Sequence, residues 1–136
     1  MNTRMPQIRE YMTPAPQTVE AEIPLKMGLE ILRKYKVRHL PVLKWGNLVG
    51  ILSDRNVNAA LSSGSPERFS VEDVMIPDPY CVPPHQSLVD VAAAMAEEKY
   101  GSTIVQDPET GNVAGIFTTT DACRALRELL ETLCTE

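Results

Sequence analysis

Residues 36–56 read KVRHLPVLKWGNLVGILSDRN, and residues 99–121 read KYGSTIVQDPETGNVAGIFTTTD. Both stretches contain a short apolar run, a turn ending in Gly-Asn, a second apolar run, and a hydroxyl residue followed three positions later by Asn or Asp. Corresponding residues lie 63 positions apart up to Val42 and Val105, and 65 apart from Gly46 and Gly111 onward. The two additional residues fall in the turn at 107–110. Such an internal repeat predicts one compact module with a pseudo-twofold axis.

Each copy is predicted to form a short strand, a helix, a hairpin and a second helix. The first helix of the first copy should begin near Pro24, because proline is well tolerated in the first turn. Apolar residues at helical spacing then share one face of each first helix. These are Leu25, Leu29 and Leu32 in the first copy and Leu88, Val91, Ala92 and Met95, after Ser87, in the second.

The hairpins are predicted from apolar runs that flank the Gly-Asn turns. Their strands are expected at 40–43 with 48–52, and at 103–106 with 113–117. The last helix is longer than its counterpart and carries an apolar stripe, which is either part of the core or an oligomer contact. The stripe comprises Ala122, Leu126, Leu129, Leu130 and Leu133.

The composition limits the classes of function. The chain has 136 residues, 43% of them apolar, with a formal net charge of -5. That balance disfavours an extended nucleic-acid surface, which requires clustered bases, but it permits one small anion site. Adenine-containing RNA therefore remains only a weak alternative as a partner.

The cysteines and the N-terminal segment indicate the cellular compartment in which the protein is expected. Cys81, Cys123 and Cys134 are odd in number and lack Cys-x-x-Cys spacing, so neither a disulfide framework nor a zinc site is predicted. The two histidines are far apart, and we expect no metal site. No segment approaches the length of a membrane span or of a signal-peptide core. We therefore expect a cytoplasmic protein that is not associated with a membrane.

The repeated motifs resemble those of the cystathionine-beta-synthase (CBS) domain. The resemblance rests on Val37–Val42 followed by Gly50–Ser53, and on the openings Ile8–Pro14 and Val71–Met75, each with a Met before a turn. It spans about residues 8–130 and implies a CBS pair, or Bateman module. The implied fold class is α/β (α+β), with tandem repeats related by pseudo-twofold symmetry, each a small sheet packed with two helices.

The resemblance also implies boundaries. We expect the first CBS repeat at 8–62, a linker at 63–70, the second repeat at 71–130, and the end of the last helix with a tail at 131–136.

In the CBS family a Ser/Thr-x-x-Asp stretch binds the ribose of an adenosyl ligand in a cleft between the repeats. Here the matching residues are Thr118 and Asp121, and a carboxylate suits a diol because its oxygens accept from both hydroxyls. The resemblance implies that Tyr80 and Val82 line the base pocket. Without the resemblance, Thr118-x-x-Asp121 is also a good helix-capping box, and the two roles are compatible.

Phosphates in such modules meet basic residues of the opposite copy. The positions implied are Arg38, His39 and Arg55. The alternative is that Arg38 and His39 simply follow a helix with a basic last turn, where the helix dipole favours positive charge without any ligand. The second cleft is predicted to be weaker because it combines Ser53 and Asn56 with Ser102, and an amide has a single acceptor oxygen. We therefore expect one competent nucleotide site.

The resemblance implies a stand-alone regulatory module. We expect it to bind AMP, ADP, ATP or an S-adenosylmethionine-like effector, to form a homodimer, and to signal to a separate regulated protein. No required cofactor and no catalytic motif is recognised, so an enzyme is not expected. The alternative is a ligand-free homodimeric interaction module with vestigial clefts.

Overall fold

The structure, a computed structural model, describes residues 4–64 and 66–134. Within them the chain forms two compact units. Unit 1 combines residues 4–15 with 80–134, and unit 2 comprises residues 16–79 except residue 65. Each unit has its own sheet, its own helices and its own buried apolar cluster.

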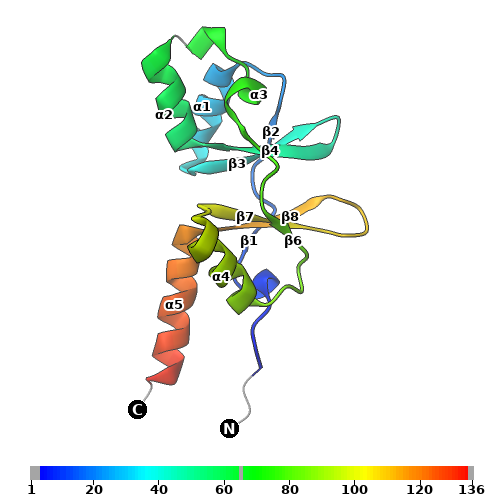
Figure 1. Cartoon of the computed structure of the whole chain (residues 1–136), viewed down its shortest axis with the longest axis vertical. Coiled ribbons are helices and arrows are strands. Elements are labelled where there is room, and N and C mark those ends of the chain that lie inside the picture. The colour runs from blue at the N-terminus through cyan, green and yellow to red at the C-terminus, as the bar shows by residue number, and fades with distance from the viewer. Residues whose placement is uncertain (1–3, 65, 135–136) are drawn as a thin grey trace. The chain divides into compact units, whose positions relative to one another are not determined.

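Unit 2 contains a four-stranded sheet in the order β2-β3-β4-β5. Its strands are β2 (Val19–Glu20), β3 (His39–Lys44), β4 (Asn47–Ser53) and β5 (Ile76–Pro77). Its helices are α1 (Leu25–Tyr35), α2 (Asp54–Ser63) and α3 (Val71–Val74), with a 3-10 turn at Pro66–Arg68. The helices lie on one face of the sheet (Figure 1).

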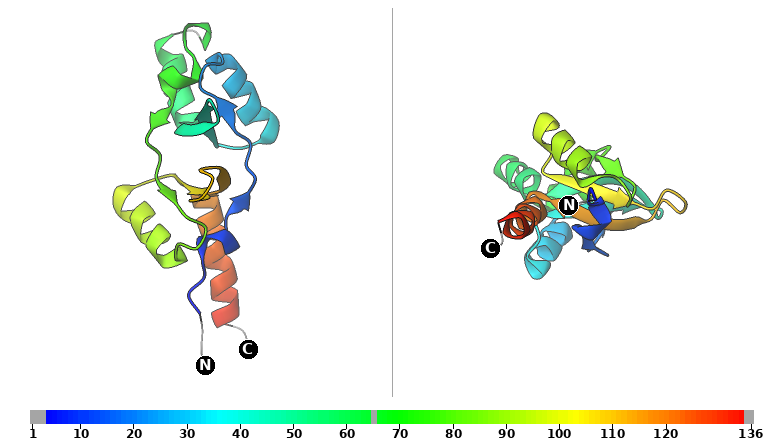
Figure 2. Two further views of the ribbon diagram at one scale, coloured as in Figure 1. Left: turned by 90° about the vertical axis from the view of Figure 1, so that its right-hand side faces the viewer. Right: turned by 90° about the horizontal axis from the view of Figure 1, so that it is seen from below.

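Unit 1 repeats this plan with a sheet in the order β1-β8-β7-β6. Its strands are β1 (Thr13–Pro14), β6 (Cys81–Val82), β7 (Ser102–Gln106) and β8 (Val113–Thr118). A 3-10 turn at Ile8–Glu10, α4 (Leu88–Glu98) and α5 (Thr119–Leu133) complete it. Its helices also share one face of the sheet (Figure 2). The described residues thus form the mixed α/β architecture that the sequence predicted, and each hairpin lies where its Gly-Asn turn indicated.

In each sheet, one edge strand belongs to one repeat but pairs with a strand of the other repeat. β1 opens the first repeat, yet it pairs antiparallel with β8 of the second, and β5 likewise pairs with β4. The repeats and the compact units therefore divide the chain at different points. The segment expected as a linker, 63–70, contains the end of α2 and the second 3-10 turn. Residue 65 of that segment, and residues 135–136 of the expected tail, lie outside the described residues.

Two glycines make the edge pairing possible. β1 passes over Gly115, and a Cβ at that position would meet the Met12 side chain and come within 2.9 Å of the Thr13 carbonyl oxygen. Gly50 is in the same situation, with Met75 and the Ile76 carbonyl oxygen, 2.8 Å away, above it. A side chain would therefore separate each edge strand from its neighbour, which explains the glycine in both copies of the motif.

The helix faces agree in part with the predicted ones. Leu25, Leu32, Leu88, Val91 and Met95 are buried, and Leu29 packs partly against the core of unit 2. Ala92 is exposed, which corrects its assignment to the buried face. The buried stripe of α4 is narrower than helical spacing alone indicated, since only positions 88, 91 and 95 are buried.

The stripe of α5 is largely not core. Ala122 and Leu129 pack partly against the core of unit 1, but Leu126, Leu130 and Leu133 are 58%, 48% and 78% exposed. The helix is the longest in the described part of the chain and continues past the strands of its unit, so its distal leucines find no partner there (Figure 2). The core interpretation of these three leucines is therefore wrong in this chain taken alone.

Replacing Gly115 with alanine should lower the free energy of unfolding by about 1–3 kcal/mol, the usual range for overpacking. Met12 can rotate away, but the Thr13 carbonyl cannot move without loosening the β1–β8 pairing. Chemical denaturation followed by circular dichroism measures the change.

Gly64→Ala is the matched control, because a Cβ there finds its nearest neighbours at 3.8 Å. It makes the same change to the unfolded chain and should shift stability by less than about 1 kcal/mol. Equal effects of the two substitutions would contradict the close approach as the reason for Gly115.

Candidate functional site

The carboxylate of Asp121 is the centre of the candidate site. Asp121 is only 3% exposed, in the first turn of α5. Its Oδ2 accepts hydrogen bonds from the Thr118 amide nitrogen at 3.0 Å and from the Thr118 hydroxyl at 3.2 Å. Its Oδ1 accepts from the Thr13 hydroxyl at 3.1 Å and from Arg124 Nη1 at 2.7 Å. Four donors therefore surround one buried carboxylate.

The local sequence explains this geometry. Thr118 is the N-cap of α5, and its hydroxyl also accepts a bond from the Asp121 amide nitrogen at 3.4 Å, which completes a capping box. Arg124 lies one helical turn beyond Asp121, where i,i+3 side chains meet. Thr13 comes from β1, 108 residues earlier in the chain. The predicted capping role of the Thr118–Asp121 motif is thus confirmed.

The counterpart in unit 2 is organised differently. The Ser53 hydroxyl accepts a hydrogen bond from the backbone N–H of Asn56 at 3.1 Å and donates one to Asn56 Oδ1 at 2.7 Å. The Asn56 side-chain nitrogen donates to the Val74 carbonyl oxygen at 3.4 Å. An aspartate could not make this last bond, because a carboxylate has no N–H to donate. Asn56 therefore fastens the start of α2 to the end of α3.

The predicted phosphate ligands lie together at the start of α2 in unit 2. His39 is opposite Ser53 in the β3–β4 register, and the Arg38 carbonyl oxygen accepts from the Asp54 amide nitrogen at 2.9 Å. Arg55 lies in the first turn of α2. The fold thus brings three basic residues, distant in the sequence by up to 17 positions, to one end of the hairpin.

Burial lowers the pKa of the His39 imidazole below its ordinary value of 6.5. Nearby Asp54 raises that pKa and Arg38 lowers it, and burial is the largest of the three effects. At neutral pH His39 is therefore mostly uncharged. It can still donate one N–H to an anion, but it does not contribute a full positive charge there.

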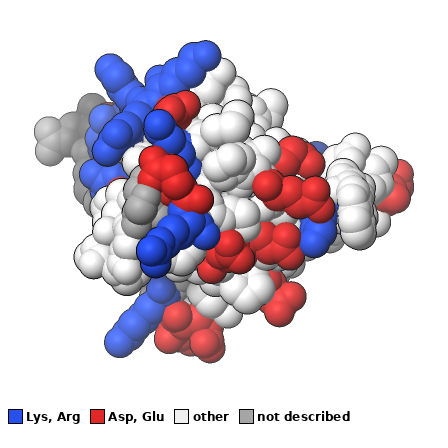
Figure 3. Space-filling model, turned by 90° about the horizontal axis from the view of Figure 1, so that it is seen from above, with Lys and Arg blue, Asp and Glu red and all other residues white. Residues whose placement is uncertain are grey.

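The charged side chains are unevenly distributed. On the face seen from above in Figure 3, Lys and Arg gather mainly toward one side, and Asp and Glu mainly toward the other. A net charge of -5 thus coexists with a locally basic region, which is compatible with binding a small anion.

The predicted base-pocket residues differ in accessibility. Tyr80 is half-buried beside β6, and its ring stacks on Tyr100 with centroids 5.0 Å apart and planes inclined by 20°. Burial, with smaller effects of Tyr100 and Asp90, raises the pKa of its phenol, so the group stays neutral. Val82 packs in the core of unit 1. Ser102, assigned to the weaker cleft, begins β7 opposite Thr118.

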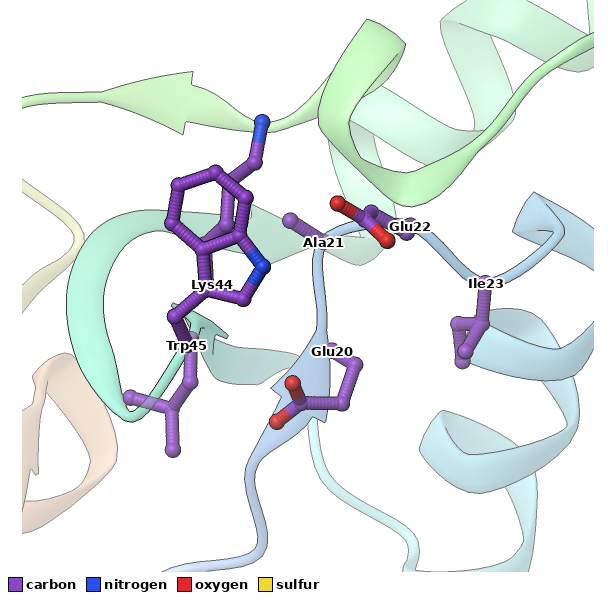
Figure 4. A pocket seen from close by; sticks show the side chains of 7 residues that line it. Glu20, Ala21, Glu22, Ile23, Lys44 and Trp45 are labelled. Carbon is purple, nitrogen blue, oxygen red and sulfur yellow. The ribbon is translucent and has the colours of Figure 1, made fainter.

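A separate pocket of about 250 Å³ lies in unit 2 and includes none of the predicted site residues. Figure 4 shows the indole of Trp45 over it, with the carboxylates of Glu20 and Glu22 nearby. Trp45 is 82% exposed, and the Lys44 ammonium lies 5.3 Å from the centroid of the indole ring. The exposed indole thus makes a cation–π contact with Lys44.

Sequence reasoning missed Thr13 and Arg124. Arg124 could have been found from its i,i+3 spacing to Asp121 on the predicted helix. Nothing in the sequence pattern pairs Thr13 with a residue 108 positions away. Among the described residues no group of three or more His, Cys, Asp and Glu side chains could hold a metal ion. Within the same residues, no helix combines the length and the apolar character needed to cross a membrane.

Two similar α/β units, each completed by an edge strand from the opposite repeat, define a tandem-repeat module. The family model described as CBS domain matches residues 8–63 and 71–128. The chain therefore belongs to the CBS domain family and carries two copies of that domain. A search of curated proteins gives no match.

Solved structures of CBS-pair proteins have the same fold. A putative acetoin utilization protein (AcuB) from Vibrio cholerae is 28% identical, with a TM-score of 0.82, over 94% of this chain and 95% of that one. CBSX2 of Arabidopsis thaliana, solved in complex with AMP, is 29% identical, with a TM-score of 0.77, over 90% and 97%. The CBS domain pair of protein MJ0100, in complex with 5'-methylthioadenosine and S-adenosyl-L-methionine, is 24% identical, with a TM-score of 0.81, over 89% and 99%.

The lowered pKa of His39 predicts a pH-dependent stability. In the unfolded chain the imidazole titrates near 6.5, so between that value and its folded pKa the unfolded state binds more protons. The contribution of His39 is complete above pH 6.5 and is lost as the pH falls through the folded pKa. Wild type should therefore lose more unfolding free energy between pH 7.5 and 5.5 than His39→Gln does, as measured by urea denaturation.

The control is His85→Gln, at the other histidine, which is exposed. It should keep the wild-type pH slope. If His39→Gln keeps that slope as well, burial does not govern the titration of His39.

Proposed function

We propose that this chain is a regulatory module that binds an adenosyl ligand, with Asp121 accepting hydrogen bonds from the ribose hydroxyls. The observation that carries the proposal is a buried carboxylate at the start of a helix, in the motif that the CBS family uses for ribose. A charged acceptor makes stronger hydrogen bonds to a diol than a neutral one. The AMP complex of CBSX2, at 29% identity, supports the same ligand class.

The proposed roles divide by residue. Thr118 and Asp121 take the ribose, and the Tyr80 ring lies against the base. Val82 is buried in the core of unit 1. We therefore propose that it supports the base pocket by packing behind it and does not contact the base. Arg38, His39 and Arg55 remain the proposed phosphate ligands on the sequence argument, with His39 acting as an uncharged donor at neutral pH.

The weaker cleft stays assigned to Ser53, Asn56 and Ser102. The amide of Asn56 already uses its oxygen for Ser53 and its nitrogen for Val74. A neutral amide has one acceptor oxygen and accepts from a diol more weakly than a carboxylate does, which supports a single competent site built on Asp121.

The module is proposed to act without catalysis of its own. A ligand that binds one conformation better than another shifts the population toward it, and a separate protein would read that shift. The regulated partner, the choice among AMP, ADP, ATP and S-adenosylmethionine, and a cytoplasmic location remain predictions from the sequence.

Asp121→Asn should weaken AMP binding at least about tenfold, because one charged acceptor of the ribose is lost. Isothermal titration calorimetry measures the affinity, and a thermal melt first establishes that the variant is folded. Asp90→Asn is the matched control, since Asp90 has the same position after an N-cap serine, in α4 of the same unit. It should bind AMP as wild type does. Equal AMP affinity of wild type and Asp121→Asn would overturn the ribose role.

A second candidate function is a ligand-free homodimeric interaction module, which the exposed leucines of α5 favour. Leu126, Leu130 and Leu133 recur at helical spacing on one face and are 48–78% exposed. Such a stripe on a helix is typical of a contact with a second helix. Absence of binding of any adenosyl ligand by a folded dimer would favour this function over the first.

Leu130→Glu should convert a dimer to a monomer in sedimentation velocity, because it places a charge within the apolar stripe. Thr132→Glu adds the same charge outside the face formed by these three leucines, about 100° around α5 from Leu133, where the side chain is exposed, and should leave the dimer intact. A monomeric wild type, or a dimer that persists in Leu130→Glu, would contradict the α5 contact.

A further inference from the structure

The acceptor capacity of Asp121 is fully used. An ionised carboxylate offers about four lone-pair positions, two on each oxygen. In this chain Thr118 supplies both donors to Oδ2, and Thr13 and Arg124 supply one each to Oδ1. A ribose that approaches Asp121 with two hydroxyl donors must therefore displace at least one donor that is already in place.

The four donors are not equally able to leave. The two from Thr118 belong to the capping box of α5, and Thr13 lies in β1, whose backbone pairs with β8. Arg124 is different, since its side chain is 50% exposed and, among the described residues, its hydrogen bond and ion pair are both with Asp121. Its departure would disturb neither a strand nor a helix cap. A half-exposed ion pair is also weak enough to be exchanged.

We propose that Arg124 is a latch: it occupies the ribose position of Asp121, yields to the ribose hydroxyls, and then pairs with an anionic group of the ligand. This inference rests on the proposed function. Arg124 is the natural receiver of a phosphate, because its guanidinium starts next to the ribose position and a planar fork suits phosphate oxygens.

The latch selects a ligand class. Displacing Arg124 costs one charge-assisted hydrogen bond, and a phosphate on the ligand replaces it with another. Neutral adenosine displaces the same guanidinium but offers it no anionic partner, so the guanidinium then hydrogen-bonds only to water. The site should therefore favour a nucleotide over the nucleoside. The position that corresponds to Arg124 in the first repeat is Ala59, so the start of α2 has no latch of this kind.

Arg124→Gln tests the latch with two ligands, AMP and adenosine, each titrated by calorimetry. The variant should bind adenosine more tightly than wild type, because no guanidinium has to be displaced, and AMP about as tightly, because the removed cost and the lost phosphate contact offset each other. The ratio of AMP affinity to adenosine affinity should fall by about tenfold, the worth of one charge-assisted contact. The control is Arg127→Gln on the same helix, where Arg127 pairs with Glu131 at 3.3 Å. It changes the net charge equally and should keep the wild-type ratio.

The outcomes separate the latch from the proposed function. If wild type binds both ligands, Asp121→Asn weakens both and Arg124→Gln leaves the ratio unchanged, the latch is overturned and the ribose site stands. An equal fall in Arg127→Gln also overturns it, because the effect is then long-range charge. If wild type binds neither ligand, both proposals fail.

A measurement on wild type covers the case in which Arg124→Gln does not fold. Salt screens a half-exposed ion pair, so adenosine should bind more tightly as ionic strength rises. Adenosine has no charge of its own, so this trend cannot come from screening of a ligand charge. Adenosine affinity that is independent of salt, or that falls with salt, counts against the latch.

Discussion

The buried carboxylate of Asp121 joins three parts of unit 1 that the sequence keeps apart. It accepts from the cap of α5 through Thr118, from β1 through Thr13, and from the body of the helix through Arg124. A carboxylate that is 3% exposed is stable only if its acceptor positions are filled, because an unpaired buried charge is strongly unfavourable. The edge strand, the helix start and the candidate ribose site therefore depend on one group.

The same constraint explains the difference between the repeats. In unit 2 the equivalent position must hold a backbone carbonyl, that of Val74, and an amide does so where a carboxylate cannot. In unit 1 the surrounding groups are donors, and only an acceptor fits. Asn56 must donate a hydrogen bond, whereas Asp121 must accept several, in two otherwise similar units. The asymmetry of the candidate sites follows from this difference.

Much of this arrangement could be predicted from the sequence. The two Gly-Asn turns and the apolar runs beside them placed both hairpins, and the spacing of Leu25, Leu29 and Leu32 indicated the buried face of α1. The Thr118–Asp121 motif indicated a capping box. Spacing could not reveal that the leucines of α5 are exposed, because helical periodicity defines a stripe without saying what covers it. The exchange of edge strands and the Thr13–Asp121 bond depend on contacts between distant segments, which local patterns do not encode.

A crystal structure of wild type with AMP tests the central claim most directly, since the claim is that Asp121 exchanges protein donors for ribose hydroxyls. The predicted result is at least one ribose hydroxyl within hydrogen-bond distance of a carboxylate oxygen of Asp121. Thr118 should remain in its capping box, and the guanidinium of Arg124 should have left Oδ1. AMP bound elsewhere, with Asp121 still holding Thr13 and Arg124, would contradict it.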